Sequence, residues 1–289
     1  MHLDRVNELI NTGWARTKGI TGRGVTVAVV DTGIFLHEDF DKERIVGFYD
    51  CFGKNILPYD DCGHGTHVAG IIAGNGRASG GKYEGVAPGA SLVVVKALDY
   101  RGDGKFETVI KALNKIKDRV YEDNIRIVNI SMGAALAGRG MNGHALVEVV
   151  EKLWDMGVVV CVAAGNKGPA AYSVTMPGIS PRVITVGFIS QGENHCSKGP
   201  TKSCVVKPEI IAPGNNIVSC MNGPGKYTVK SGSSMATPIV SGAIALLLEM
   251  YPSMTNVQVK KRLYERTVDL GYDKNIQGWG WLDIKRLLC

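Results

Sequence analysis

The stretch SGSSMATP at residues 231–238 runs directly into an apolar segment that ends at Met250. A glycine-containing turn is followed here by a helix that is apolar on nearly all sides, which is typical of a helix inside a large core. Pro238 is compatible with the first helical turn, because the first N–H groups of a helix have no intrahelical partner. The stretch therefore predicts a central, buried helix that begins near Ser234.

Ser234 would lie at the positive end of this helix dipole, among free backbone N–H donors. A nucleophile whose product is an oxyanion is favoured at such a position. Serine is also a common helix N-cap residue, so this segment taken alone favours a structural cap over a nucleophile. The remainder of the chain has to decide between the two roles.

Several runs of mostly β-branched residues predict strands that are buried on both faces, which is typical of a parallel sheet covered by helices. These runs are residues 25–30, 92–97, 125–130, 158–163 and 183–186. Apolar residues recur at helical spacing between some of them, for example at 106–120 and 146–154. We therefore predict an α/β fold with a doubly wound, mostly parallel sheet and helices on both faces.

The organisation of the chain indicates one domain over residues 1–289, with residues 1–20 as a short N-terminal lead-in. No composition shift, internal repeat or proline-rich linker divides it. The formal net charge of +6 is spread along the chain, so it gives no reason to expect a nucleic-acid partner. The oligomeric state cannot be derived from these features.

Two observations bear on location. No apolar run approaches the roughly 18 residues of a membrane span, so we expect no membrane partner. No secretory signal precedes the first strand, and we expect a cytoplasmic location, with a processed secreted form as the alternative. The 7 cysteines are odd in number and irregularly spaced, which favours free thiols over a disulfide framework. A pair between Cys196 and Cys204 across a short loop is the alternative that we considered.

Polar residues with catalytic chemistry follow the ends of other predicted elements. Asp31 ends the first strand, at the sheet edge where open α/β sheets carry their sites. His64 begins a helix of small residues, and it is either a structural histidine or a base that faces a cleft. Asn166 follows the strand at 158–163, and it is either a turn residue or an amide donor to negative charge. His67 is three residues from His64, but the glutamate of a zinc-protease helix is missing, so we predict no metal there.

The order Asp, His, Ser along the chain is that of the subtilisin triad. The surrounding sequences strongly resemble those of the subtilisin-like serine proteases, the subtilases. The resemblance rests on VVDTGI at 29–34, HGTHVAG at 64–70 and GSSMATP at 232–238, with shorter matches at 85–88, 129–133 and 212–214. Within the family, residues 70–76 and 124–129 are most similar to intracellular bacterial subtilases of the AprX type.

The resemblance implies a role for each of four residues. Ser234 would attack the scissile carbonyl, and His64 would accept its proton and pass it to the leaving amine. Asp31 would hold the imidazole in the required tautomer. Asn166 and the backbone N–H of Ser234 would form the oxyanion hole. We therefore expect a serine endopeptidase that acts on polypeptides and needs no cofactor for its chemistry.

The resemblance also implies which residues bind substrate. Two backbone segments would hold an extended peptide between them: Ser131, Met132 and Gly133 on one side, and Gly102, Asp103 and Gly104 on the other. Lys167 follows Asn166 directly, so we expect it near the pocket that receives the side chain before the cut, where it would favour or tolerate acidic residues.

Two questions stay open at this stage. Many subtilases hold structural calcium, and Asp39 lies where the family often keeps a carboxylate ligand. The glycine-rich, basic loop at 74–84 offers few oxygen-bearing side chains, but backbone carbonyls could serve as ligands, so structural calcium stays possible and no metal site is assigned. A dedicated processing protease with one protein target, and a catalytically idle subtilase that serves as a binding module, are the alternatives to a general endopeptidase.

Overall fold

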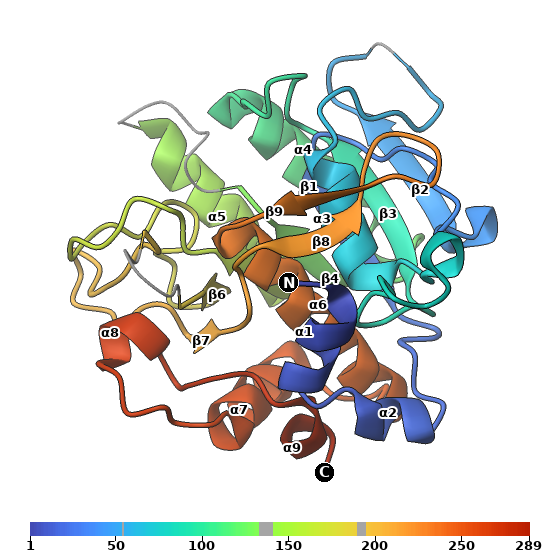
Figure 1. The fold of residues 1–289 in the computed structure, drawn as a ribbon. Coiled ribbons are helices and arrows are strands. Elements are labelled where there is room, and N and C mark those ends of the chain that lie inside the picture. The colour runs from blue at the N-terminus through green and yellow to red at the C-terminus, as the bar shows by residue number, and fades with distance from the viewer. Residues whose placement is uncertain (54, 133–140, 190–194) are drawn as a thin grey trace.

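A parallel sheet of seven strands forms the centre of the protein over the part of the chain that the structure describes (Figure 1). That structure is a computed structural model and describes residues 1–53, 55–132, 141–189 and 195–289. The strands lie in the order β2-β3-β1-β4-β5-β6-β7. In chain order they are β1 (Thr26–Asp31), β2 (Ile45–Asp50), β3 (Ser91–Lys96), β4 (Ile125–Ile130), β5 (Val159–Ala163), β6 (Ile184–Gly187) and β7 (Ile210–Ile211).

Helices cover both faces of the sheet, because the strands carry apolar side chains on both. On β1, Val27 and Val29 belong to one core cluster, whereas Ala28 and Val30 belong to the other. The first cluster includes residues of α3 (His64–Ala73) and α6 (Ser233–Met250), and the second includes residues of α4 (Phe106–Arg119) and α5 (Met141–Asp155). The predicted α/β fold with a doubly wound parallel sheet is confirmed.

Shorter elements surround these layers. The helices are α1 (Leu3–Leu9), α2 (Gly13–Thr17), α7 (Asn256–Arg266), α8 (Lys274–Gln277) and α9 (Ile284–Leu288). An antiparallel hairpin, β8 (Ile217–Cys220) and β9 (Tyr227–Lys230), leads into α6. The N-terminal lead-in is part of the core, because Leu3 and Val6 of α1 are fully buried and the N–H of Val218 donates to the carbonyl of Met1 at 2.9 Å.

The central helix α6 corrects one expectation. With 18 residues and a mean hydropathy of 1.4, it has the length and composition of a membrane-spanning helix, but 83% of its residues are buried inside the protein. The expectation that no apolar segment reaches this length was therefore wrong. The burial of α6 between the sheet and α3 accounts for its composition, as it does for many core helices of globular proteins (Figure 1).

The topology brings candidate residues to one edge of the sheet. β1 pairs with β3 on one side and with β4 on the other, so the strand order changes direction at β1. Ligands of open α/β sheets bind outside the carboxyl ends of the strands at such a switch point. Asp31 ends β1, and the segments that follow β3 and β4 leave the sheet on either side of it.

The sequence reasoning overlooked the edge strand β2 and the hairpin. β2 is half-buried and lacks the continuous apolar run of a strand buried on both faces. The disulfide considered between Cys196 and Cys204 is contradicted by the described residues, since Cys204 is an exposed free thiol.

The core role of α6 can be tested by removing one buried side chain. Leu247 is fully buried, so we expect Leu247→Ala to lower the free energy of unfolding by about 2–5 kcal/mol through lost burial and the resulting cavity. Urea unfolding measures this, in a background where Ser234, the expected nucleophile, is replaced by alanine. Val257→Ala is the matched control, because Val257 is 62% exposed in α7. Equal effects of the two substitutions would contradict the buried position of α6.

Candidate active site

A short hydrogen bond joins the carboxyl end of β1 to the start of α3. His64, the first residue of α3, donates from Nδ1 to Oδ1 of Asp31 at 2.7 Å. The same carboxylate oxygen accepts the N–H of Thr32 at 2.8 Å. Asp31 is fully buried, whereas the side chain of His64 is 23% exposed. The pair therefore has its carboxylate inside the protein and its imidazole at the surface of a pocket.

The close approach of α3 to β1 depends on a glycine. A Cβ at Gly65 would overlap the carbonyl oxygen of Gly33, so a larger residue at this position would push the helix away from the strand end. The N–H of Gly65 donates to the hydroxyl of Thr32 at 2.8 Å, which fixes the helix at this distance. These contacts set the separation of Asp31 and His64.

Asp60 organises the loop that precedes His64. Its carboxylate accepts the N–H groups of Cys62, Gly63 and Thr66 and the hydroxyl groups of Thr66 and Thr32, at 2.6–3.0 Å. Burial by itself raises the pKa of Asp60, but the hydrogen bonds from Thr66, Gly63 and Cys62 outweigh it and hold the pKa below its usual value. Asp60 is therefore a charged anchor for the turn into α3.

Lys96, at the end of β3, is buried behind the same region. Its ammonium group donates to the carbonyl of Thr32 at 2.6 Å, to the carboxylate of Asp61 at 2.5 Å and to the carbonyl of Leu98 at 3.1 Å. Because only 1% of Lys96 is exposed, these partners compensate its charge inside the protein. The Lys96 ammonium thus joins the segment after β1, the loop before α3 and the segment after β3.

Asp31 and burial act in opposite directions on His64. Burial lowers the pKa of His64, the adjacent carboxylate of Asp31 raises it, and the charge of Lys230 lowers it again. The net result is a pKa above the usual value of histidine, because the contact with Asp31 stabilises the imidazolium form.

The start of α6 is held against Asn166. Oδ1 of Asn166 accepts the backbone N–H of Ser233 at 3.0 Å and its hydroxyl at 3.2 Å, and that hydroxyl accepts the N–H of Gly165 at 3.1 Å. The amide oxygen is therefore occupied, which leaves the amino group of Asn166 as the donor toward a ligand. Gly232 has φ +138°, and a Cβ there would lie 2.9 Å from Nδ2 of Asn166, so this position requires glycine.

These elements meet around one pocket of about 270 Å³. Its lining contains His64, Ser234 and Asn166, the three predicted residues that would face a substrate. Of the predicted substrate-binding residues it contains Ser131, Met132 and Gly102. The other lining residues are Cys62, Leu98, Arg101, Gly165, Lys230 and Ser233.

Other predicted substrate-binding residues are not among the described residues that line this pocket. Asp103 and Gly104 belong to the turn beyond Gly102 and are not part of the pocket lining. Lys167 is exposed and also does not line this pocket, while its backbone N–H donates to Ser197. Gly133 lies outside the described residues.

Sequence reasoning missed the polar groups that support the pocket and two of its cations. Asp60, Lys96 and Ser233 hold the segments in place, and Arg101 and Lys230 supply positive charge in the lining. Only Ser233 lies inside a quoted motif, whereas Asp60 precedes the histidine motif by four residues. Arg101 and Lys230 reach the pocket through the tertiary fold.

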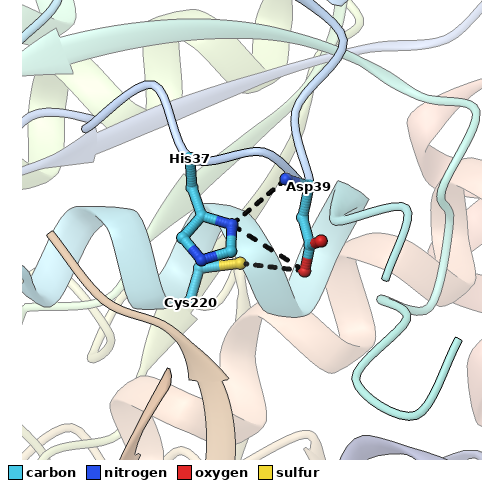
Figure 2. A group of neighbouring side chains, drawn as sticks. All are labelled: His37, Asp39 and Cys220. Atoms are coloured by element: carbon cyan, nitrogen blue, oxygen red, sulfur yellow. Dashed lines mark hydrogen bonds and ion pairs between the residues drawn. The ribbon is translucent and has the colours of Figure 1, made fainter. Parts of the chain in front are cut away.

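The surroundings of Asp39 do not fit the calcium site that the resemblance left open. Oδ1 of Asp39 accepts the N–H of Ala78 and Oδ2 accepts the hydroxyl of Tyr227, each at 2.8 Å. Its other polar neighbours are the imidazole of His37 and the thiol of Cys220 (Figure 2). Calcium takes about six to eight oxygen ligands, and the side chains beside this carboxylate offer mainly nitrogen and sulfur.

Comparison with known proteins agrees with this geometry. Residues 22–280 match the peptidase S8 family, described as the subtilase family. Serine protease AprX of Bacillus subtilis (strain 168) is 40% identical over 290 residues, covering 90% of this chain and 65% of its own length. Subtilisin E of the same organism is 36% identical over 259 residues, covering 88% of this chain and 63% of its own.

A solved structure is also similar. A cold-adapted subtilisin-like serine proteinase superimposes with a TM-score of 0.76 at 31% sequence identity, covering 91% of this chain and 90% of that one. The chain spans less than two thirds of the length of AprX and subtilisin E. The family match, which covers most of the described fold, and the Asp31–His64 pair beside Ser234 lead to the same conclusion: the chain belongs to the subtilase family.

Proposed function

We propose that this chain is a serine endopeptidase that hydrolyses peptide bonds through Asp31, His64 and Ser234. One observation carries the proposal: the pocket that contains Ser234 and Asn166 also contains the imidazole of His64, whose other nitrogen donates to the buried carboxylate of Asp31 at 2.7 Å. A serine hydroxyl is a weak nucleophile, and a base oriented by a carboxylate is the arrangement that activates it.

The first half of the reaction forms an acyl-enzyme. Oγ of Ser234 attacks the scissile carbonyl carbon while Nε2 of His64 takes the hydroxyl proton. The carbonyl electron pair moves to oxygen, where the amino group of Asn166 and the N–H of Ser234 stabilise the negative charge. The intermediate then collapses, the C–N bond breaks, and His64 returns the proton to the leaving amine.

The second half restores the enzyme. Water attacks the ester carbonyl and gives a proton to His64, and the C–O bond to Ser234 breaks as that proton returns to its hydroxyl. Asp31 stays ionised throughout and stabilises the imidazolium. Its Oδ1 accepts both the Nδ1–H of His64 and the N–H of Thr32, which keeps the imidazole in one tautomer.

Substrate would lie between two chain segments. Ser131 and Met132 follow β4, whereas Leu98 and Gly102 follow β3, and both segments line the pocket. Arg101 and Lys230 give this lining two cationic side chains and support a preference for acidic side chains near the cleaved bond. Lys167 follows the pocket residue Asn166 directly and is exposed, so it stays a further candidate for this preference.

A fluorophosphonate probe tests the proposal directly, because it reacts covalently with an activated serine. We expect the purified protein to be labelled and Ser234→Ala to lose the label, while Ser233→Ala keeps it. Absence of labelling in the unsubstituted protein would favour the idle binding module. Digestion of a peptide library then separates a general endopeptidase, which cuts many sequences, from a dedicated processing protease, which cuts few.

The oxyanion role of Asn166 predicts a loss in kcat. Removal of one such donor in subtilisin costs about 10²–10³-fold in kcat, and we expect the same order for Asn166→Ala with KM little changed. Ser233→Ala is the matched control, since it removes the hydroxyl bonded to Asn166 but no oxyanion donor. A smaller loss in Asn166→Ala than in Ser233→Ala would contradict this role.

The pH profile reports the charge state of His64. The base must be neutral to accept a proton, so kcat/KM should fall as the pH drops through the pKa of His64, which lies above the usual histidine value. The charge of Lys230 lowers this pKa, so we expect Lys230→Gln to move the acidic limb to higher pH. Lys226→Gln, an exposed charge on the same hairpin, is the control. An unchanged or opposite shift in Lys230→Gln would exclude this electrostatic coupling.

A further inference from the structure

A second cluster of reactive side chains lies outside the catalytic pocket. His37 and Asp39 follow β1, and Cys220 ends β8, so two distant parts of the chain meet here (Figure 2). His37 is 1% exposed, and Asp39 and Cys220 are fully buried. None of the three lines the pocket of Ser234.

Two distances from the Asp39 carboxylate to its neighbours are near those between the ligands of a tetrahedral metal site. Oδ2 of Asp39 lies 3.9 Å from Nδ1 of His37 and 3.6 Å from Sγ of Cys220. One ligand atom from each residue lies within 4.8 Å of the other two. Zinc bonds of about 2.0–2.3 Å at tetrahedral angles separate such atoms by about 3.3–3.5 Å. Shifts of a few tenths of an ångström would therefore let one metal ion bind Oδ2 together with Nδ1 of His37, or Oδ2 together with Sγ of Cys220.

Neighbouring hydrogen bonds orient these atoms. Nε2 of His37 donates to the carbonyl of Lys226 at 3.0 Å, which leaves the lone pair on Nδ1, the nitrogen nearest Asp39. Metal-binding histidines commonly have their second nitrogen fixed to a backbone carbonyl in this way. Oδ1 of Asp39 accepts the N–H of Ala78, so Oδ2 is the oxygen that faces the cluster.

The three candidate ligand atoms take part in hydrogen bonds that metal bonds would replace. Without metal, the thiol of Cys220 and the hydroxyl of Tyr227 both donate to Oδ2 of Asp39, and the N–H of Asp39 donates to Nδ1 of His37. A cation would form a metal–sulfur bond in place of the S–H bond, and the thiol proton would leave to solvent. The hydroxyl oxygen of Tyr227 is then available as a fourth ligand.

We propose that His37, Asp39 and Cys220 form a binding site for a thiophilic divalent cation, with zinc as the best match. One imidazole, one carboxylate and one thiolate suit zinc, whereas calcium and magnesium prefer oxygen ligands. The charges of the cation, carboxylate and thiolate sum to zero, which a buried site requires.

The cation would connect two parts of the chain that lead to the catalytic residues. His37 and Asp39 lie shortly after Asp31, and Cys220 lies on the hairpin that leads through Lys230 into α6 and Ser234. Binding to the folded state alone would stabilise the protein. Because the site is buried, we expect the cation to enter during folding.

Expression in medium that contains zinc or cobalt tests the site, with Ser234→Ala as the background to prevent self-digestion. We expect one equivalent of metal by elemental analysis, and a thiolate-to-metal absorption band in the cobalt protein. Cys220→Ser should lose both, whereas Cys161→Ser, a buried thiol on β5, and Cys62→Ser, the thiol of the catalytic pocket, should keep both.

Two outcomes would overturn the site: no bound metal in the unsubstituted cysteine background, or equal metal content in Cys220→Ser. If Cys220→Ser does not fold, the absorption band of the cobalt protein is the deciding measurement, because this band requires a thiolate ligand. Retention of the band in Cys62→Ser would show that the thiolate is not the one in the catalytic pocket. The zinc-loaded protein should also have a higher unfolding midpoint than the zinc-free protein, and Cys161→Ser should show the same increase. This test does not depend on proteolytic activity, so it can fail while the proposed function stands.

Discussion

The close approach of α3 to the end of β1 is the constraint on which the rest of the site depends. Gly65 permits it, and the hydrogen bonds of Thr32 and Asp60 maintain it. The groups that donate hydrogen bonds to Asp60 are buried or nearly buried. A buried network in which every group has a partner has few alternative arrangements. The separation of 2.7 Å between Asp31 and His64 therefore follows from the loop around Asp60 as much as from the pair itself.

The sheet topology explains why a cleft forms at this place. Because β3 and β4 lie on opposite sides of β1, the segments after them diverge and leave the end of β1 open. The helix α6 lies against the sheet (Figure 1), and its first turn carries Ser234, which lines the pocket. The end of β1 and the starts of α3 and α6 thus converge at the carboxyl edge of the sheet.

The predictable features were those with a local signal. The apolar run 25–30 indicated a strand buried on both faces, and the short sequences around Asp31, His64 and Ser234 indicated the family. The edge strand β2 was missed because its residues are only half-buried. Lys96 looks like a solvated residue at the end of a strand, and its burial is set by partners more than thirty residues away.

Lys96 divides the segment after β3 into an anchored base and a turn that is hydrogen-bonded mainly within itself. The carbonyl of Leu98 is held by the Lys96 ammonium and its N–H by the carbonyl of Asp31, whereas the following turn makes hydrogen bonds mainly within itself, around Asp99. Changes of length or sequence beyond Leu98 would thus be mechanically isolated from Asp31 and His64. A change in this short surface turn, by natural divergence or by loop exchange, could therefore alter the preference for peptides while Asp31 and His64 keep their positions.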